Sequence, residues 1–217
     1  CEIEINPIND PPYFSNFGDI TINEDNSYYQ NWATEISSGA YNENQEIFFV
    51  VSFDSSQFIA SYSLDFEGYF SINPNEHANG ETIFDVYLDD GEGLQSETVD
   101  YDLVINPVND IPIINNQFGI LEVEDCGFDQ ESCNDNNKLI LNIEMFDVYD
   151  VEDEDLFLHI DHDNINDHYT TDGELGIYID QHFNSENEGV ITVPVYITDT
   201  DGADSEIFPC EIEILPV

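Results

Sequence analysis

The chain has 217 residues, of which 49 are Asp or Glu and only one, Lys138, is Lys or Arg, so its formal net charge at pH 7 is −48. A charge of this size excludes nucleic acid and anionic membranes as natural partners. Hydrophobic residues make up 41% and aromatic residues 13%, which favours a folded body over disorder. No stretch approaches the roughly 18 apolar residues of a membrane-spanning helix, so we expect no membrane insertion in this segment. Bound divalent cations are the leading means of offsetting the self-repulsion.

An octet near the start of the chain returns one hundred positions later: INPINDPP covers residues 5–12 and INPVNDIP covers residues 105–112. Each copy follows an alternating apolar segment, so each marks the place where a strand ends and a linker begins. The spacing predicts two domains of about 100 residues, over 9–106 and 107–217.

The first residues resemble the last ones, because CEIEINPIND begins the chain and CEIEILPV ends it. We therefore expect residues 1–8 to be the final strand of a preceding repeat in a longer tandem array. The alternative is a strand that is donated to a neighbouring chain and completes its sheet.

Short alternating or β-branched runs recur between clusters of Asn, Asp, Gly and Ser, and helical periodicity is nearly absent. This pattern predicts an all-β chain of two tandem antiparallel Greek-key β-sandwiches. In the first unit we expect strands over 20–22, 46–53, 69–72, 82–88 and 99–105. In the second we expect them over 120–123, 139–146, 156–160, 176–179, 190–198 and 208–214.

Cys126 and Cys133 enclose the short segment CGFDQESC. Their spacing favours a small disulfide-closed loop, which would imply an oxidising compartment. A zinc site is the weaker alternative, because no second cysteine pair or well-spaced histidine follows. The partners of Cys1 and Cys210 stay open.

Four motifs, taken together, resemble the bacterial cadherin-like, immunoglobulin-like tandem repeats of large surface adhesins. The first is the linker pair NPINDPP and NPVNDIP, and the second is an early acidic turn, ITINEDNSY at 20–28 and LEVEDCG at 121–127. The third is PNEHANG at 74–80, and the fourth is a long strand that ends in an Asp-Gly turn, VYLDDGEG at 86–93 and VYITDTDGADSE at 195–206. The second unit departs from the pattern around 126–138. The resemblance implies cadherin-like or immunoglobulin-like sandwiches in an extracellular protein.

The same resemblance implies Ca²⁺ at the junctions between repeats, because calcium takes six to eight oxygen ligands from carboxylates, amides and backbone carbonyls. For the junction within the chain it implies ligands from the base of the first unit, the linker and the top of the second: Glu24, Glu76, Asn109, Asp110, Asp150, Glu152, Asp153, Asp199 and Asp201. For the upstream junction it implies Asn9, Asp10, Glu43, Asp89 and Asp90, and for the downstream end Glu124 and Asp125. The alternative is that these are solvated turn residues, which Asp, Asn and Gly form for backbone reasons alone.

Other chemistries have weaker support in the sequence. His159, His162 and His168 could hold a transition metal, but a polar surface loop is the favoured interpretation. The chain has no GxSxG, HExxH or phosphate-binding glycine loop, and we expect no enzyme. Trp32 and most other aromatic residues are expected in the core.

These observations predict an extracellular structural or adhesive module, stiffened by calcium, in a cell-surface stalk, adhesin or filament. Its partners would be neighbouring repeats or identical subunits arranged head to tail. The alternatives are a sandwich that binds a surface glycan or protein ligand, and accessory domains of a secreted enzyme.

Overall fold

The computed structural model describes residues 8–41, 43, 45–124, 138–152, 155–164, 169–179 and 190–215. The chain forms two compact units, Cys1–Val108 and Asn109–Val217, and each is considered by itself. Within the described ranges the regular structure consists of strands and one short 3-10 helix, so the predicted all-β class is confirmed. No helix in the described part is long and apolar enough to cross a bilayer. Residues 1–7, Cys126 and Cys133 lie outside the described residues, so the predicted extra strand and disulfide stay predictions.

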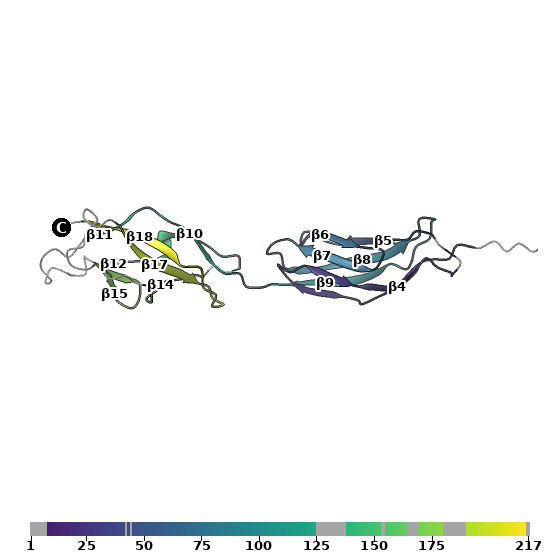
Figure 1. Cartoon of the computed structure of the whole chain (residues 1–217), viewed down its shortest axis with the longest axis horizontal. Helices are drawn as coiled ribbons and strands as arrows, with labels where there is room; N and C mark the ends of the chain where they lie inside the picture. Colours follow the sequence, from purple (N-terminus) through teal and green to yellow (C-terminus); the bar gives the residue numbers. More distant parts are fainter. Residues whose placement is uncertain are drawn as a thin grey trace, which may run out of the picture. The chain divides into compact units, whose positions relative to one another are not determined.

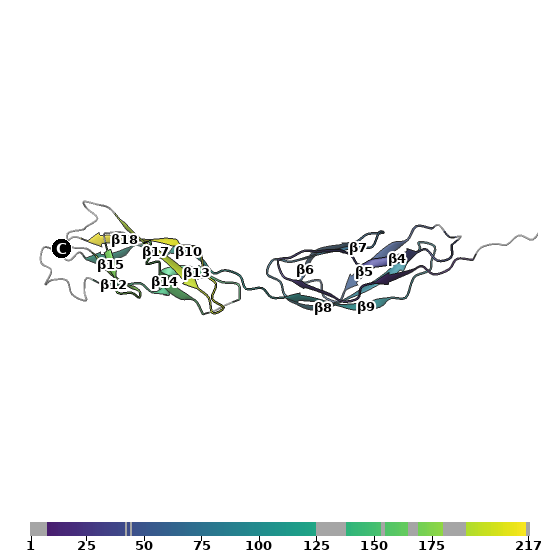
Figure 2. The same cartoon turned by 60° about the horizontal axis from the view of Figure 1, so that its bottom comes forward.

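The first unit is a sandwich of two layers. One layer is a sheet with the order β2-β9-β8-β5, and the other holds the sheet β3-β7-β6 and the pair β1-β4. Figure 2 shows β6 and β7 along one side of this unit and β8 and β9 along the other. The chain changes layers between β5 and β6 and again between β7 and β8, which is a Greek-key arrangement. The strands are β1 Tyr13–Asn16, β2 Ile20–Asn23, β3 Tyr28–Asn31, β4 Ala33–Ser37, β5 Phe48–Phe53, β6 Ile59–Leu64, β7 Tyr69–Pro74, β8 Gly80–Asp89 and β9 Val99–Asn106.

The core of the first unit is aromatic. Trp32 is completely buried, as expected, and its ring makes edge contacts with Phe70 at 5.6 Å and Tyr101 at 5.0 Å between ring centroids. The indole N–H donates a hydrogen bond to the Gly18 carbonyl at 2.7 Å, so the polar atom of this buried ring is satisfied. Alternation along β8 buries every second side chain, including Phe84.

The second unit repeats the arrangement of the first (Figure 1). One layer has the order β11-β18-β17-β14, and the other holds β12-β16-β15 and the pair β10-β13. In both units a short early strand pairs in parallel with the last one, β2 with β9 and β11 with β18, whereas the other strand pairs of the described residues are antiparallel. The strands are β10 Ile113–Gln117, β11 Leu121–Glu124, β12 Lys138–Ile140, β13 Phe146–Tyr149, β14 Phe157–Ile160, β15 Tyr169–Thr171, β16 Gly176–Ile179, β17 Ile191–Thr198 and β18 Phe208–Leu215.

One predicted strand is wrong in form. The sequence predicts one continuous strand over 139–146, but β12 ends at Ile140, the 3-10 helix η3 covers Ile143–Met145, and β13 begins at Phe146. The break lets this segment pair with β16 on one side and with β10 on the other. Several short strands were also missed, β6 among them, because most of its side chains are exposed and no apolar alternation marks it.

Candidate cation-binding clusters

Linker residues and acidic turns meet at the end of the first unit where β8 terminates. The Asn9 amide donates a hydrogen bond to Asp90 Oδ2 at 2.6 Å, and the backbone N–H of Asp10 donates to Glu43 Oε1 at 2.8 Å. Gln45 Nε2 donates to Asn9 Oδ1 at 2.6 Å and orients that amide. We call Asn9, Asp10, Glu43 and Asp90 the first N-terminal cluster.

Asp90 is a buried carboxylate that also shapes the turn after β8. Its Oδ1 accepts backbone hydrogen bonds from Glu92 and Leu94, both at 2.9 Å, while Oδ2 accepts the Asn9 amide. Burial opposes its ionisation, but the hydrogen bonds from Asn9 and from the backbone outweigh burial and lower the pKa of Asp90. The group is therefore an anion at neutral pH.

The second unit places equivalent residues in equivalent contacts. The Asn109 amide donates to Asp199 Oδ2 at 2.9 Å, and the Asp110 backbone N–H donates to Glu152 Oε2 at 3.1 Å. The Glu152 N–H in turn donates to Asp150 Oδ1 at 3.0 Å. We call Asn109, Asp110, Asp150, Glu152 and Asp199 the second N-terminal cluster.

Several carboxylates lie close together in the second N-terminal cluster, and their negative charges affect one another. Asp199 Oδ1 accepts the N–H groups of Gly202 and Ala203 at 2.6 and 2.8 Å. The Asn109 hydrogen bond and these backbone bonds lower the pKa of Asp199 against the effect of burial. Glu152 behaves in the opposite way: desolvation and the charges of Asp110 and Asp150 raise its pKa, although the Asp110 N–H acts against them. A bound cation would offset the repulsion and desolvation that raise the pKa of Glu152, because a nearby opposite charge favours the ionised form.

The other end of the first unit holds Glu24, directly after β2. Its carboxylate accepts hydrogen bonds from the Val108 N–H at 2.7 Å and the Asn79 amide at 3.2 Å. The parallel pairing of β2 with β9 brings this about, since it delivers Glu24 and the residues after Asn106 to the same end of the sheet. Glu24 thus anchors the start of the linker to the first unit.

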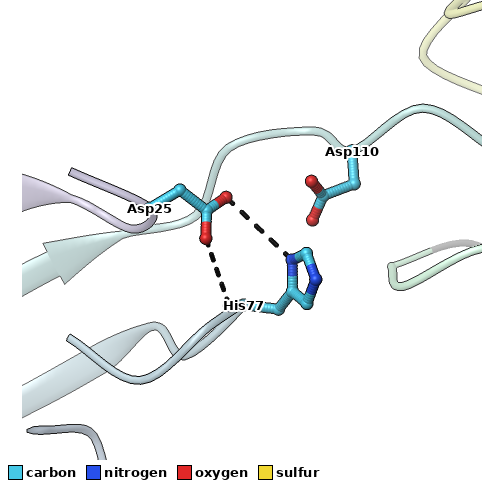
Figure 3. Close-up of side chains that lie close together, drawn as sticks. All are labelled: Asp25, His77 and Asp110. Atoms are coloured by element: carbon cyan, nitrogen blue, oxygen red, sulfur yellow. Dashed lines mark hydrogen bonds and ion pairs between the residues drawn. The ribbon is translucent and has the colours of Figure 1, made fainter. Parts of the chain in front are cut away.

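Asp25 and His77 face each other next to Glu24 (Figure 3). The His77 backbone N–H donates to Asp25 Oδ1 at 3.3 Å, and His77 Nδ1 lies 4.0 Å from Asp25 Oδ2. Both residues have positive φ angles, 61° and 53°, which are uncommon outside glycine and mark tight turns. Asp110, also drawn in Figure 3, belongs to the second unit.

Three carboxylates in these regions are almost fully buried: the exposed fractions are 0% for Glu24, 1% for Asp90 and 3% for Asp199. The sequence contains a single Lys or Arg, and this residue, Lys138, pairs with Asp172 at 2.7 Å. No lysine or arginine is therefore left to neutralise the buried anions. The clusters bring together carboxylates of Asp and Glu and side-chain amides of Asn, whose oxygens fit a hard cation such as Ca²⁺.

Some of the predicted calcium ligands lie in the two N-terminal clusters, and others lie outside them. Asp89 lies in the same turn as Asp90, but its carboxylate accepts hydrogen bonds from the Gly91 N–H at 2.7 Å and the Gln95 amide at 2.9 Å. Asp201 lies in the exposed turn after Asp199. Glu76 is exposed and lies 3.7 Å from His77. Asp153 and Asp125 lie outside the described residues, as does the side chain of Glu124. An ion shared by Glu24, Glu76, Asn109 and Asp110 would involve both units and stays a prediction.

The sequence did not single out Gln45, Asn79, Asp25 or His77. Asn79 and His77 lie within the motif PNEHANG, and Asp25 lies within NED. The motifs therefore indicated the right segments, but they did not indicate which side chains contact one another. Of the histidines considered for a transition metal, His159 stacks on Tyr196 at 5.0 Å between ring centroids, and His162 Nδ1 lies 3.0 Å from Thr171 Oγ1. His168 lies outside the described residues.

No protein-family model and no curated protein sequence matches this chain. Among solved structures, it is similar to Drosophila N-cadherin EC1-4, with a TM-score of 0.51 and 13% identity over 96% of this chain and 50% of that one. Human protocadherin-24 EC1-2 has a TM-score of 0.47 and 12% identity, over 97% of this chain and 100% of that one. The chain spans half of the N-cadherin structure and 40% of the five-domain protocadherin gamma B2 structure. The likeness to N-cadherin confirms the cadherin-like β-sandwich fold.

Proposed function

We propose that this chain is an extracellular structural or adhesive module that binds Ca²⁺ at the ends of its sandwiches. One observation carries the proposal: both units make the same contacts between a linker Asn-Asp pair and a buried acidic turn. Asn9 and Asn109 bind Asp90 and Asp199, and the N–H groups of the next residues bind Glu43 and Glu152.

Calcium is supported over the alternative of solvated turns by burial and by missing countercharge. Asp and Asn occupy exposed turns for backbone reasons, but Asp90 and Asp199 are almost fully buried in a chain with one Lys and no Arg. Burying a carboxylate is costly unless it is both hydrogen-bonded and paired with a positive charge, and these two have hydrogen bonds but no lysine or arginine. Magnesium requires near-ideal octahedral geometry and keeps several waters, whereas calcium accepts irregular sets of carboxylates, amides and carbonyls.

The bound ions would also restrain the linker. Glu24 holds Val108 to the first unit, and Asn109 and Asp110 contact Asp199 and Glu152 of the second. An ion bound to Asn109 and Asp110 would remove backbone freedom from a short linker, which would otherwise bend as a flexible chain. A linker that resists bending is needed in a stalk, adhesin or filament whose neighbours are further repeats or identical subunits. The proposal assigns no catalytic role to the chain.

The test compares the protein in EDTA with the protein in calcium, one unit at a time. Trp32 is the only tryptophan, so its fluorescence reports unfolding of the first unit, while amide exchange of β17 reports the second. Calcium at 100 times its Kd should stabilise a unit by about 2.7 kcal/mol. Magnesium should stabilise each unit less than calcium does. Small-angle X-ray scattering should show a narrower distribution of radii of gyration for the chain in calcium than in EDTA.

Matched variants assign the sites. Asp90→Asn should abolish the calcium effect in the first unit only, and Asp199→Asn in the second unit only. Asp89→Asn serves as the control, because the Asp89 carboxylate is bound by Gly91 and Gln95, whereas Asp90 is bound by the linker residue Asn9. Identical melting curves and scattering in calcium and in EDTA would refute the proposal.

A further inference from the structure

The outward face of β3, β7 and β6 in the first unit is an uncharged surface. The strand sequences YYQN, YFSINP and IASYSL contain no acidic or basic residue. In the opposite layer, β8 and β9 carry Glu81, Asp85, Asp89, Asp100 and Asp102. In a chain with 49 acidic residues, a complete sheet without charge is a distinct surface.

Two tyrosines form an exposed stack on this face. The rings of Tyr29 and Tyr69 lie 5.5 Å apart between centroids at an interplanar angle of 17°, and the residues are 67% and 37% exposed. Tyr29 lies opposite Ser71 and Tyr69 opposite Asn31, so the tyrosines are diagonal neighbours on paired strands. Because the rings support each other, the stack is held in place without a ligand.

The stack continues into rows of small polar side chains across the sheet. Ser71 lies opposite Ser63, and Asn73 lies opposite Ser61, with Asn73 Nδ2 donating to Ser61 Oγ at 2.9 Å. These side chains point outward, because Ile72, between Ser71 and Asn73, is completely buried. Successive rows on one face are about 7 Å apart, twice the rise per residue. The surface thus offers hydroxyl and amide donors and acceptors beside exposed aromatic rings.

We propose that this face binds a neutral carbohydrate chain. The Tyr29–Tyr69 stack would pack against the C–H faces of a sugar ring, since aromatic faces are electron-rich. The serine and asparagine side chains would form hydrogen bonds with sugar hydroxyls, a combination of aromatic surface and a few placed polar groups that is typical of small-ligand sites.

The charge around the face selects a neutral ligand. Asp65, Glu67 and Glu76 lie in the turns that flank the three strands, so an anionic polysaccharide would be repelled. A protein partner fits less well, because serine is depleted in the cores of protein interfaces, whereas Ser61, Ser63 and Ser71 occupy outward positions of this sheet. The paired outward positions of these strands hold Tyr, Ser and Asn, and the aliphatic side chain exposed beside them is that of Ala60, at the register shift in β6.

The test is affinity electrophoresis of the intact 217-residue protein through gels that contain mannan, xylan, β-1,3-glucan or β-1,4-glucan, with alginate as the anionic comparison. At least one neutral polysaccharide should retard the protein, equally in calcium and in EDTA, and alginate should not. Tyr29→Ala and Tyr69→Ala should each weaken binding by about tenfold or more, a loss of roughly 1.4 kcal/mol. Tyr41→Ala removes a fully exposed tyrosine that lies outside the sheet and should change nothing. Trp32 fluorescence verifies that each variant is folded.

Three results would overturn the assignment. The first is the absence of retardation by all four neutral polysaccharides. The second is retardation that persists in the Tyr29→Ala, Tyr69→Ala double variant or that requires calcium, which would assign binding to another surface. The third is sedimentation that shows Tyr29-dependent self-association without polysaccharide binding, which would make the face a contact between copies. Because the prediction holds in EDTA, its failure is distinguishable from failure of the calcium proposal.

Discussion

The side-chain amide of Asn109 donates a hydrogen bond to the buried carboxylate of Asp199 at 2.9 Å. This bond joins the first residue of the second unit to the turn that follows β17. The same relationship exists between Asn9 and Asp90, at 2.6 Å, in the first unit. The repeated linker motif is therefore part of each sandwich that follows it, and is more than a spacer.

Replacing Asn109 by alanine should destabilise the second unit. The change removes a hydrogen bond to an ionised group and leaves Asp199 buried with fewer donors. The pKa of Asp199 should rise toward its ordinary value, since the Asn109 bond is the main cause of its decrease. The midpoint of thermal unfolding of the second unit should fall by several degrees, measured by amide exchange of β17 and β18. Asn115→Ala, at an exposed position of β10, should leave it unchanged.

The facing acids on β8 and β9 should destabilise the first unit at neutral pH. Asp85 lies directly opposite Asp100. A hydrogen bond with Asp85 and its negative charge, with smaller contributions from desolvation and Asp54, raise the pKa of Asp100. The folded state therefore binds this proton more tightly than the unfolded state does. The corresponding stability is gained as the pH falls through the raised pKa, and it is absent at neutral pH.

Asp85→Asn should accordingly raise the melting temperature of the first unit at pH about 7, and the gain should disappear below the ordinary carboxyl pKa of about 4. Trp32 fluorescence melts across this range measure it. The matched control is Asp102→Asn, because Asp102 lies opposite Ile83 on β8 and not opposite an acid of that strand. A gain that does not depend on pH, or an equal gain in the control, would show that the pairing of the two acids is not its cause.

The single cationic side chain should stabilise the second unit over a defined pH range. Hydrogen bonding from Lys138, then from the backbone N–H groups of Glu174 and Gly176, lowers the pKa of Asp172 to about 2. Because this pKa is depressed, the stabilisation is present above the ordinary value near 4 and is lost as the pH falls toward about 2. Lys138→Met should lower the melting temperature at pH about 7, and calorimetry should show the difference shrinking between pH about 4 and about 2. A difference in melting temperature that stays constant over this pH range would mean that the variant has lost packing contacts of the Lys138 side chain, and not the effect of its charge.

Trp32→Ala should unfold the first unit far more easily. The ring is completely buried among Phe70, Phe84 and Tyr101, and truncation of a buried aromatic residue costs about 3–5 kcal/mol. Urea titration followed by circular dichroism should show the first unit unfolding at lower urea, with the second transition unchanged. The exposed Tyr41→Ala change should stay within about 0.5 kcal/mol of wild type.

Much of the fold followed from the sequence where burial imposes a clear pattern. The long central strands β8, β9, β17 and β18 alternate apolar and polar residues, because one face of each packs on the core. The short strands β1, β3 and β6 have little or no such alternation, and tertiary pairing alone makes them strands. The parallel pairs β2–β9 and β11–β18 join segments that are distant in the sequence, so no local pattern announced them.

The sequence by itself determined the acidic character, the all-β class and the repeated linker, since charge, alternation and turn residues are local properties of the chain. Only the tertiary structure decided which acids contact the linker: buried Asp90 accepts a hydrogen bond from Asn9, while its neighbour Asp89 binds Gly91 within the same turn. It also decided that Glu24 is buried against Val108 and that Tyr29 stacks on Tyr69. Adjacent side chains on a strand point in opposite directions. Their partners come from elements far away in sequence, so pairing in space is set by the folded chain as a whole.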